Sequence, residues 1–485
     1  MEYDKYELLY GGAYSIKDYY MESGNPRQMR GASVILNDCA EDLKKILKDD
    51  GICENHIIAS GASLSALIPI GTGDKYVSQA ENLYWELSRT VNVAFVSVPF
   101  VKFNNDYIQT KKHALAEYDN RRSIKFTSWD YQNWPDQALE YDFAPPGAPQ
   151  HCVRCKIRDT VYEVPVNGAK LYLCTSCAQR EAKNKKVKYE QRKRCGCQFK
   201  YSYDISDVHD LADDYGRVAL LYADVNNLGG QAYKETFDED RDFHIAVDKA
   251  VKNAVYKAIR HVMGADEIKV GTHIDAKFEI IALGGDDVCL LLPGNTALLA
   301  AKMIIDEFKN NEYNLTISVA ACIANDTTAL TYMEKITTTS LDKKAKKLAN
   351  CKKSNNQSAV HLSYYEKPSD IFPMASVDFD VFYDLLKKVK ADSIAISALR
   401  NISNARHELK FNDEFKLFFH YYLSRVAEIN KNSQMILKQI YNKYINENIN
   451  GDEDEDNNLD IDNDVDKDES KNPWLDFITW YTQNL

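Results

Sequence analysis

The chain has 485 residues, 45% of them hydrophobic, a length that predicts about three to four domains. Its apolar runs are too short to span a membrane and its first residues are polar, so we expect a cytoplasmic protein with neither a signal peptide nor a membrane partner. Residues 451–470 account for −10 of the net charge of −12, and the nearly neutral remainder argues against bulk electrostatic capture of nucleic acid.

Residues 1–135 predict one α/β domain. Apolar residues at helical spacing alternate with short runs of branched residues in the order βαββαβ, which is the ferredoxin-like arrangement. The expected elements, in chain order, are 7–10, 32–48, 56–59, 64–68, 77–88 and 93–98. The hairpin in the middle of this unit turns at 60–63.

A proline-rich stretch, 136–150, predicts a linker. The segment 150–200 then carries two Cys-x-x-Cys pairs, eighteen residues apart. Eleven cysteines in a cytosolic chain favour metal ligands or free thiols over disulfides, and this spacing is typical of a structural Zn²⁺ site, although chance placement is the alternative. The expected ligands are Cys152, Cys155, Cys174 and Cys177, whereas Cys195 and Cys197 are not assigned.

Nine lysines and arginines lie between Arg180 and Lys200. A solvated helix face is one interpretation of this basic segment. A patch that contacts the phosphates of RNA is the other.

Residues 215–365 repeat the order of the first unit. Strands are expected at 218–224, 281–283, 288–292 and 315–323, with helices at 242–263, 296–310 and 330–350. The two units therefore resemble a diverged duplication in which 60–63 takes the place of 284–287.

The second unit contains the hairpin turn Gly284, Gly285, Asp286 and Asp287. Adjacent carboxylates repel each other and are retained most easily when a divalent cation neutralises them. A solvated acidic turn is the alternative. Asp224 ends the strand expected beside this hairpin, so three carboxylates would meet in a site for two Mg²⁺ or Mn²⁺ ions.

Two further groups belong to this predicted site. The turn after Asp224 contains Asn227, Leu228 and Gly229, whose backbone amides would cradle a triphosphate. Four lysines lie in the last helix of the unit, and Lys346 is the one expected to reach the phosphates, although a solvated face is the alternative for all four.

Residues 375–447 predict a small helical bundle. An acidic, disordered linker is expected at 450–472 and an aromatic tail at 473–485. Asp460–Asp464 begins like a calcium loop, but Val465 stands where that loop needs glycine, so no calcium site is expected.

Together these motifs resemble the large subunit of type III CRISPR effector complexes, in its Csm branch. The segment 224–229 and the 284–287 turn are similar to that family's DVDNLG and GGDD motifs, and 14–20 and 27–33 are similar to two segments of its first palm domain. The order of domains also matches. The resemblance implies an α+β protein: a catalytically degenerate first palm domain, a zinc element, an active second palm domain and a C-terminal helical domain.

The family's activity would make this chain a nucleotidyltransferase that polymerises ATP into cyclic oligoadenylates. It would work in a complex with CRISPR RNA, target RNA and other Cas subunits. The resemblance assigns metal binding to Asp224, Asp286 and Asp287, and nucleotide contacts to the glycines of the turn and to 227–229. Asn226 stands where the family has aspartate, which would weaken a second metal.

The chain starts at the first palm, so we expect no HD nuclease domain, and His209-Asp210 is an isolated dipeptide. Two alternatives to the synthetase remain. One is a non-catalytic scaffold or nucleotide sensor of an RNA complex. The other is a freestanding diguanylate-type cyclase, which shares the palm but needs neither a zinc element nor a second palm.

Overall fold

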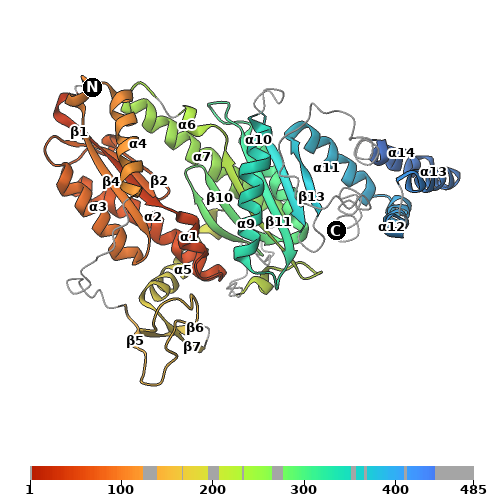
Figure 1. Ribbon diagram of the computed structural model, residues 1–485, viewed down its shortest axis with the longest axis horizontal. Coiled ribbons are helices and arrows are strands. Elements are labelled where there is room, and N and C mark those ends of the chain that lie inside the picture. Colours follow the sequence, from red (N-terminus) through yellow and green to blue (C-terminus); the bar gives the residue numbers. More distant parts are fainter. Residues whose placement is uncertain are drawn as a thin grey trace.

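The computed structural model describes residues 3–123, 139–166, 168–194, 207–231, 234–264, 277–350, 357–364, 369–408 and 412–442. Cys195, Cys197, the acidic segment and the aromatic tail lie outside the described residues. Figure 1 shows two sheets side by side, with a small cysteine-containing unit below the first and helices beyond the second. The α+β fold class expected from the sequence is confirmed.

The first palm is a four-stranded antiparallel sheet in the order β2-β3-β1-β4. Its strands are β1 (Tyr6–Tyr14), β2 (Ile57–Ser60), β3 (Ser63–Pro69) and β4 (Asn92–Pro99). Helices α2 (Pro26–Asp49) and α3 (Gly73–Ser88) cover one face, and α4 (Tyr107–Ser123) packs on the other. The short α1 (Ile16–Met21) precedes α2. The expected βαββαβ order is present. Helices α1 and α4 were not expected, because α1 has only six residues and few residues of α4 are apolar.

The second palm repeats this order and extends it. Its sheet runs β13-β12-β11-β8-β10-β9, so the four strands that match the first palm take the same relative places. They are β8 (Arg217–Val225), β9 (Glu279–Gly284), β10 (Asp287–Pro293) and β11 (Ile317–Asn325), followed by β12 (Ala359–Tyr364) and β13 (Ser369–Ala375). Strand β12 pairs in parallel with β11.

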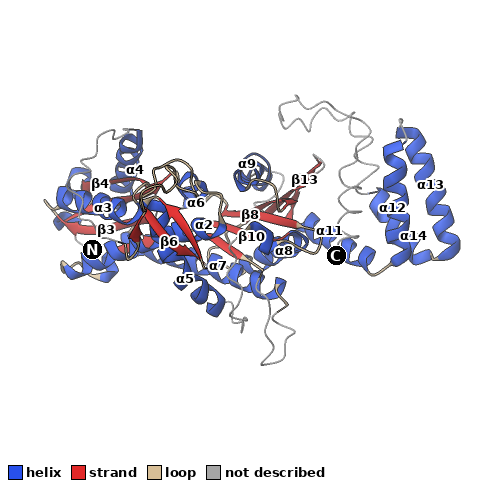
Figure 2. Ribbon diagram, turned by 90° about the horizontal axis from the view of Figure 1, so that it is seen from below, coloured by secondary structure: helices blue, strands red, loops and turns tan. Residues whose placement is uncertain are grey.

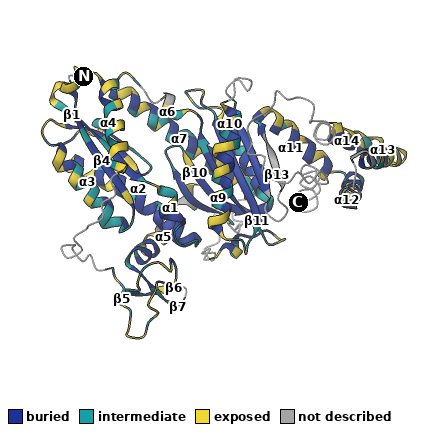
Figure 3. Ribbon diagram, viewed as in Figure 1, coloured by how far each residue is buried: buried dark blue, intermediate teal, exposed yellow. Residues whose placement is uncertain are grey.

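Two layers of helices enclose this second sheet (Figures 1 and 3). Helices α7 (Phe237–Val262) and α8 (Ala297–Phe308) pack on one face and share a core with β8, β10 and β11. On the other face lie α9 (Leu330–Ser340), a π-helical turn (Leu341–Ala345) and α10 (Lys346–Ala349). The single helix expected over 330–350 is thus interrupted at its centre. The core on this face also includes residues of the first palm, so the two palms share one hydrophobic interior.

The cysteine element has a three-stranded sheet and one long helix. Its elements are β5 (Asp142–Phe143), β6 (Tyr162–Val166), β7 (Ala169–Leu173) and α5 (Thr175–Arg194). Helix α5 packs along α2 of the first palm. The element is therefore fixed to the helix that also borders the second palm.

The C-terminal part is helical, as expected. Helix α11 (Ser376–Lys390) packs against the second sheet, and α12 (Ser393–Glu408), α13 (Asn412–Ile429) and α14 (Lys431–Ile440) form a bundle at the far end (Figure 2). Of the helices in the described residues, none combines the length and hydrophobicity that crossing a membrane requires.

Candidate active site

The acidic hairpin turn lies at one end of β9 and β10. Strand β9 ends at Gly284 and β10 begins at Asp287, which is its partner across the ladder. Gly285 has a φ of +64°, a value that glycine adopts without steric cost, so the chain reverses within two residues. Buried branched residues on both strands hold the turn at the edge of the core.

Asp224 lies on the strand next to this hairpin. Val288 of β10 pairs with Ala223 of β8, so the antiparallel register brings Asp287 opposite Asp224 one residue further. The predicted neighbourhood of the strand end and the hairpin tip is therefore confirmed. Both side chains project from the sheet face that α9 and α10 cover, where Asp224 meets Lys346.

The surroundings of Asp224, Asp286 and Asp287 disfavour the ionised form of all three carboxylates. Removal from water, followed by the charges of Asp287 and Asp224, raises the pKa of Asp286 to about 7. Loss of solvation also raises the pKa of Asp224 and that of Asp287. Carboxylates that are costly to ionise in the free protein gain most from a cation, and oxygen ligands are those that Mg²⁺ and Mn²⁺ prefer.

Two lysines flank the acids. Lys346 Nζ lies 3.0 Å from Asp224 Oδ2, and its charge lowers the pKa of Asp224 against the effect of burial. Lys17 of α1 sits over the ring of Tyr222, 5.2 Å from its centroid, and its charge partly offsets the rise in the pKa of Asp287 that burial causes. The first palm thus contributes a charge to the acidic cluster that the sequence analysis did not identify.

The three acids do not form a compact ligand cage. Within the part of the chain that the structure describes, the four cysteines are the one group of three or more possible metal-binding residues whose ligand atoms all lie within 4.8 Å of one another. The neighbouring strands bring Asp224 and Asp287 together as expected, but an ion pair with Lys346 holds Asp224. These residues fit a Mg²⁺ or Mn²⁺ site because they are carboxylates and because they lie on neighbouring strands and their connecting turn.

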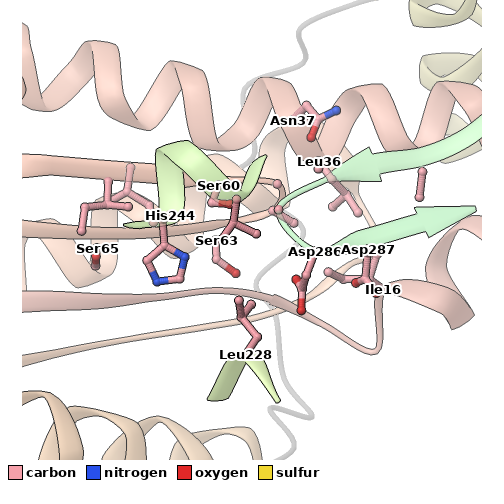
Figure 4. A pocket seen from close by; sticks show the side chains of 18 of the residues that line it. Ile16, Leu36, Asn37, Ser60, Ser63, Ser65, Leu228, His244, Asp286 and Asp287 are labelled. Carbon is pink, nitrogen blue, oxygen red and sulfur yellow. The ribbon is translucent and has the colours of Figure 1, made fainter. Parts of the chain in front are cut away.

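A cavity of about 550 Å³ opens between the two palms. This volume is within the range of small-ligand sites. In Figure 4, Asp286, Asp287 and Ile16 lie at one end and His244 and Ser65 at the other, with Ser60 and Ser63 between them. The hairpin turns of both palms therefore line one space.

The segment after Asp224 divides between the cavity and the core. Asn227 has a φ of +54° and turns the chain, and Leu228 and Gly229 line the cavity. Asn226 is buried instead: it donates to Thr316 Oγ1 at 2.9 Å and accepts from Ser318 Oγ at 2.7 Å. Its amide ties the turn to β11, which explains an asparagine at this position.

A buried polar cluster at the far end of the cavity was missed by the sequence analysis. Asp240 of α7 accepts hydrogen bonds of 2.6 Å from both Lys111 and Tyr107 of α4. Burial lowers the pKa of Lys111 and that of the adjacent His244. From the sequence alone, nothing distinguishes isolated charged helix residues at an interface between two domains from those on the surface.

Asp248 of α7 is a second residue that sequence reasoning did not find. Its Oδ1 accepts a hydrogen bond of 3.0 Å from the backbone amide of Gly285, at the centre of the acidic turn. Lys252, one helical turn later, lies 2.7 Å from Asp248 Oδ2. In the sequence this pair resembles an ordinary i,i+4 surface ion pair.

The four cysteines predicted to bind zinc form one buried cluster. Their sulfur atoms lie within 4.8 Å of one another, and the Sγ atoms of Cys155 and Cys174 are 3.9 Å apart. Tetrahedral Zn²⁺ with bonds of about 2.3 Å needs sulfur atoms about 3.8 Å apart. The cluster fits a structural zinc ion with no open position.

The expectation of a solvated or phosphate-binding helix over 180–200 is wrong at its first residue. Arg180 is fully buried, lies 2.8 Å from Glu22 and stacks 4.3 Å from the ring centroid of Tyr19. Lys183 is exposed but pairs with Asp38 at 2.6 Å. The start of α5 is therefore an attachment to the first palm.

Two buried ion pairs join α2 to α5 and to β9. Arg27 pairs with Glu181 of α5 at 2.5 Å, and one helical turn later Arg30 pairs with Glu279, the first residue of β9. All four side chains are buried. Helix α2 thus connects the cysteine element to the strand that leads into the acidic turn.

Comparisons with known proteins agree with this geometry. Residues 217–355 match the family model of the second palm domain of Cas10/Cmr2. No curated protein matches the chain.

Three solved structures with the same fold cover most of the chain. The apo Csm1-Csm4 cassette has a TM-score of 0.56 at 13% identity and covers 87% of this chain. The Csm1-Csm4 cassette in complex with cA4 has a TM-score of 0.55 at 11% identity and covers 92%. Csm1 from T.onnurineus has a TM-score of 0.51 at 12% identity and covers 83%.

The chain spans 65%, 66% and 61% of those three chains, less than two thirds of each. At these identities the likeness concerns the fold. Residues 217–355 are therefore similar to the second palm domain of Cas10/Cmr2, in a chain that has the fold of Csm1.

Proposed function

We propose that this protein is a metal-dependent nucleotidyltransferase that polymerises ATP into cyclic oligoadenylates, as the large subunit of an RNA-guided type III CRISPR complex. The observation that carries the proposal is the cavity between the palms, which Asp286 and Asp287 line beside Asp224. The match to the Cas10/Cmr2 palm supports the same reaction class. One of the similar structures contains cA4, which supports adenylate chemistry in this fold.

Asp224, Asp286 and Asp287 are the proposed ligands of the divalent cations. When bound, such cations would supply Lewis-acid stabilisation of the attacking and leaving oxygens. The protein's own contribution is to hold three carboxylates at neighbouring strand ends, where low solvation favours their binding to a cation. Lys346, which pairs with Asp224 in this structure, would be available to contact phosphate if that carboxylate bound a cation.

The nucleotide is proposed to lie along the cavity. Leu228 and Gly229 line it from the second palm, and the turn at Asn227 directs nearby amides toward the phosphates. Gly284 and Gly285 lack side chains that would occupy this space. The family resemblance assigns nucleotide contacts to these same residues, and all of them except Asn227 line the cavity.

The proposed partners are CRISPR RNA, target RNA and other Cas subunits. The similar chains in the Csm1-Csm4 cassettes support a partner subunit of the Csm4 kind. The buried cysteine cluster is proposed to hold zinc and to stabilise the element that packs on α2.

The test is incubation of the full chain, alone and in its complex, with labelled ATP or GTP and Mn²⁺, with and without target RNA. Cyclic adenylates that disappear in the double variant Asp286→Ala/Asp287→Ala are the expected result. A guanylate product would instead support a diguanylate-type cyclase. Absence of turnover under all conditions, with the complex intact, would support a non-catalytic scaffold.

A further inference from the structure

The backbone amide of Gly285 needs a partner outside the sheet. The ladder between β9 and β10 ends with the pair of Gly284 and Asp287, so Gly285 lies beyond it. A backbone N–H that is partly shielded from water costs free energy when it is left unpaired. In this turn the partner comes from another element of the fold.

That partner is Asp248. Its Oδ1 accepts from the Gly285 amide at 3.0 Å, and its Oδ2 lies 2.7 Å from Lys252 Nζ. Both oxygens of the carboxylate are thereby used. Helix α7 is a rigid base for it, since the neighbouring Val247 and Val251 are buried in the core under β8 and β10.

The first palm supports the turn from the opposite side. A Cβ atom on Gly284 would lie 2.9 Å from the Cα of Gly61 and 3.5 Å from Asn37 Oδ1. A Cβ atom on Gly285 would lie 3.0 Å from Ser60 Oγ. The turn therefore sits between the first palm and the Asp248 carboxylate, with little freedom to tilt.

We propose that Asp248 is a positioning residue of the reaction, which fixes the acidic turn through the Gly285 amide so that Asp286 and Asp287 present their carboxylates in one orientation. This inference rests on the proposed function, because it names the residue that orients the proposed metal ligands. Asp248 touches neither the cavity nor the reacting atoms and is distinct from the ligands themselves.

The decisive variants are Asp248→Ala, which removes the acceptor, and Asp248→Asn, which keeps an acceptor oxygen of the same shape. Loss of a charge-assisted hydrogen bond that fixes catalytic geometry is expected to lower kcat by about 10- to 100-fold. KM for ATP is expected to change by less than about threefold, because Asp248 itself does not line the cavity. Asp248→Asn is expected to recover most of the loss in kcat.

The matched control is Asp242→Ala, which removes an exposed carboxylate from the same helix. It is expected to retain the wild-type kcat, and thermal unfolding of all variants is measured in parallel. Two readouts separate positioning from folding: the rescue by asparagine, and the Mn²⁺ concentration for half-maximal rate, which rises only if the ligands are misplaced.

Wild-type kcat in Asp248→Ala would overturn the inference while leaving the proposed function intact. An equal loss in Asp248→Ala and Asp248→Asn, with a lowered Tm in both, would assign Asp248 a purely structural role and would likewise overturn it. An inactive wild-type complex would instead contradict the proposed function.

Discussion

Gly61 and Gly284 lie against each other where the hairpin turns of the two palms meet: a Cβ atom on Gly284 would be 2.9 Å from the Cα of Gly61. The equivalent turns of the two palms thus form one interface. The turn of the first palm carries no carboxylate but supplies the surface on which the acidic turn rests.

Gly284→Ala is therefore expected to force the two turns apart. Overpacking of this kind costs about 1–3 kcal/mol, and displacement of Asp286 and Asp287 is expected to lower turnover by more than about tenfold. Thermal unfolding and cyclic adenylate formation measure the two effects. Gly24→Ala is the control, since its φ of +59° adds backbone strain but no atom lies within 4 Å. Equal behaviour of the two variants would contradict the contact's importance.

Lys346→Met removes the cation that pairs with Asp224. Charge-assisted contacts to phosphate contribute about 1.5–3 kcal/mol, so KM for ATP is expected to rise by about tenfold or more. Steady-state kinetics at saturating Mn²⁺ measures this change. Lys343→Met alters an exposed lysine of the same helical segment and is expected to behave as wild type. If both variants keep the wild-type KM, Lys346 has no role in binding phosphate.

Asp286→Asn is expected to stabilise the protein in the absence of added Mg²⁺ or Mn²⁺. The pKa of Asp286 is raised to about 7, well above that of an unfolded aspartate, because of burial and the neighbouring charges. The unfolded chain binds fewer protons between pH 4 and 7, so the wild type loses stability as the pH rises through this window. The variant lacks this loss, and the difference in Tm between the two is expected to grow up to about pH 7 and then level off.

Thermal unfolding across pH 4 to 8 measures that difference. Each kcal/mol recovered is expected to raise Tm by about 1 °C in a chain of this size, because the entropy of unfolding grows with chain length. Asp242→Asn, at an exposed position, provides the baseline. A difference in Tm that is independent of pH would show that Asp286 does not titrate in this range.

Metal analysis of the purified protein is expected to find one zinc ion per chain. Cys155→Ser or Cys174→Ser is expected to abolish it, because a four-cysteine site loses most of its affinity with one thiolate. Cys53→Ser changes an exposed cysteine outside the cluster and is expected to leave the zinc content unchanged. A wild-type protein free of zinc after expression with ample metal would refute the site.

The parts of the fold that follow local rules could be predicted from the sequence. The hairpin at Gly284, its neighbour strand and the cysteine cluster are each specified by short patterns, namely a tight turn, buried branched residues and paired thiols. Their relative placement followed from the βαββαβ order. Strands β12 and β13, which extend the sheet, were missed because they lie beyond the βαββαβ repeat, although Val360, Leu362 and Tyr364 of β12 alternate with polar residues.

Contacts between distant segments could not be predicted. Asp248 and Arg180 read as surface charges because helices normally expose such residues. Only the tertiary fold brings the Asp248 carboxylate to the Gly285 amide, and Arg180 into a buried pair with Glu22. Asn226 likewise resembles a weakened metal ligand until its hydrogen bonds to Thr316 and to Ser318 of β11 are seen.

Helix α2 has a close backbone contact on one side and a buried ion pair on the other. A Cβ atom on Gly31 would lie only 2.1 Å from the carbonyl oxygen of Arg180, so α2 and α5 are in direct main-chain contact. The adjacent Arg30 is paired with Glu279 at the start of β9. The cysteine element and the first residue of β9 are therefore fixed to the same helix, so the element could shift relative to β9 only if α2 moved with it or one of these contacts broke.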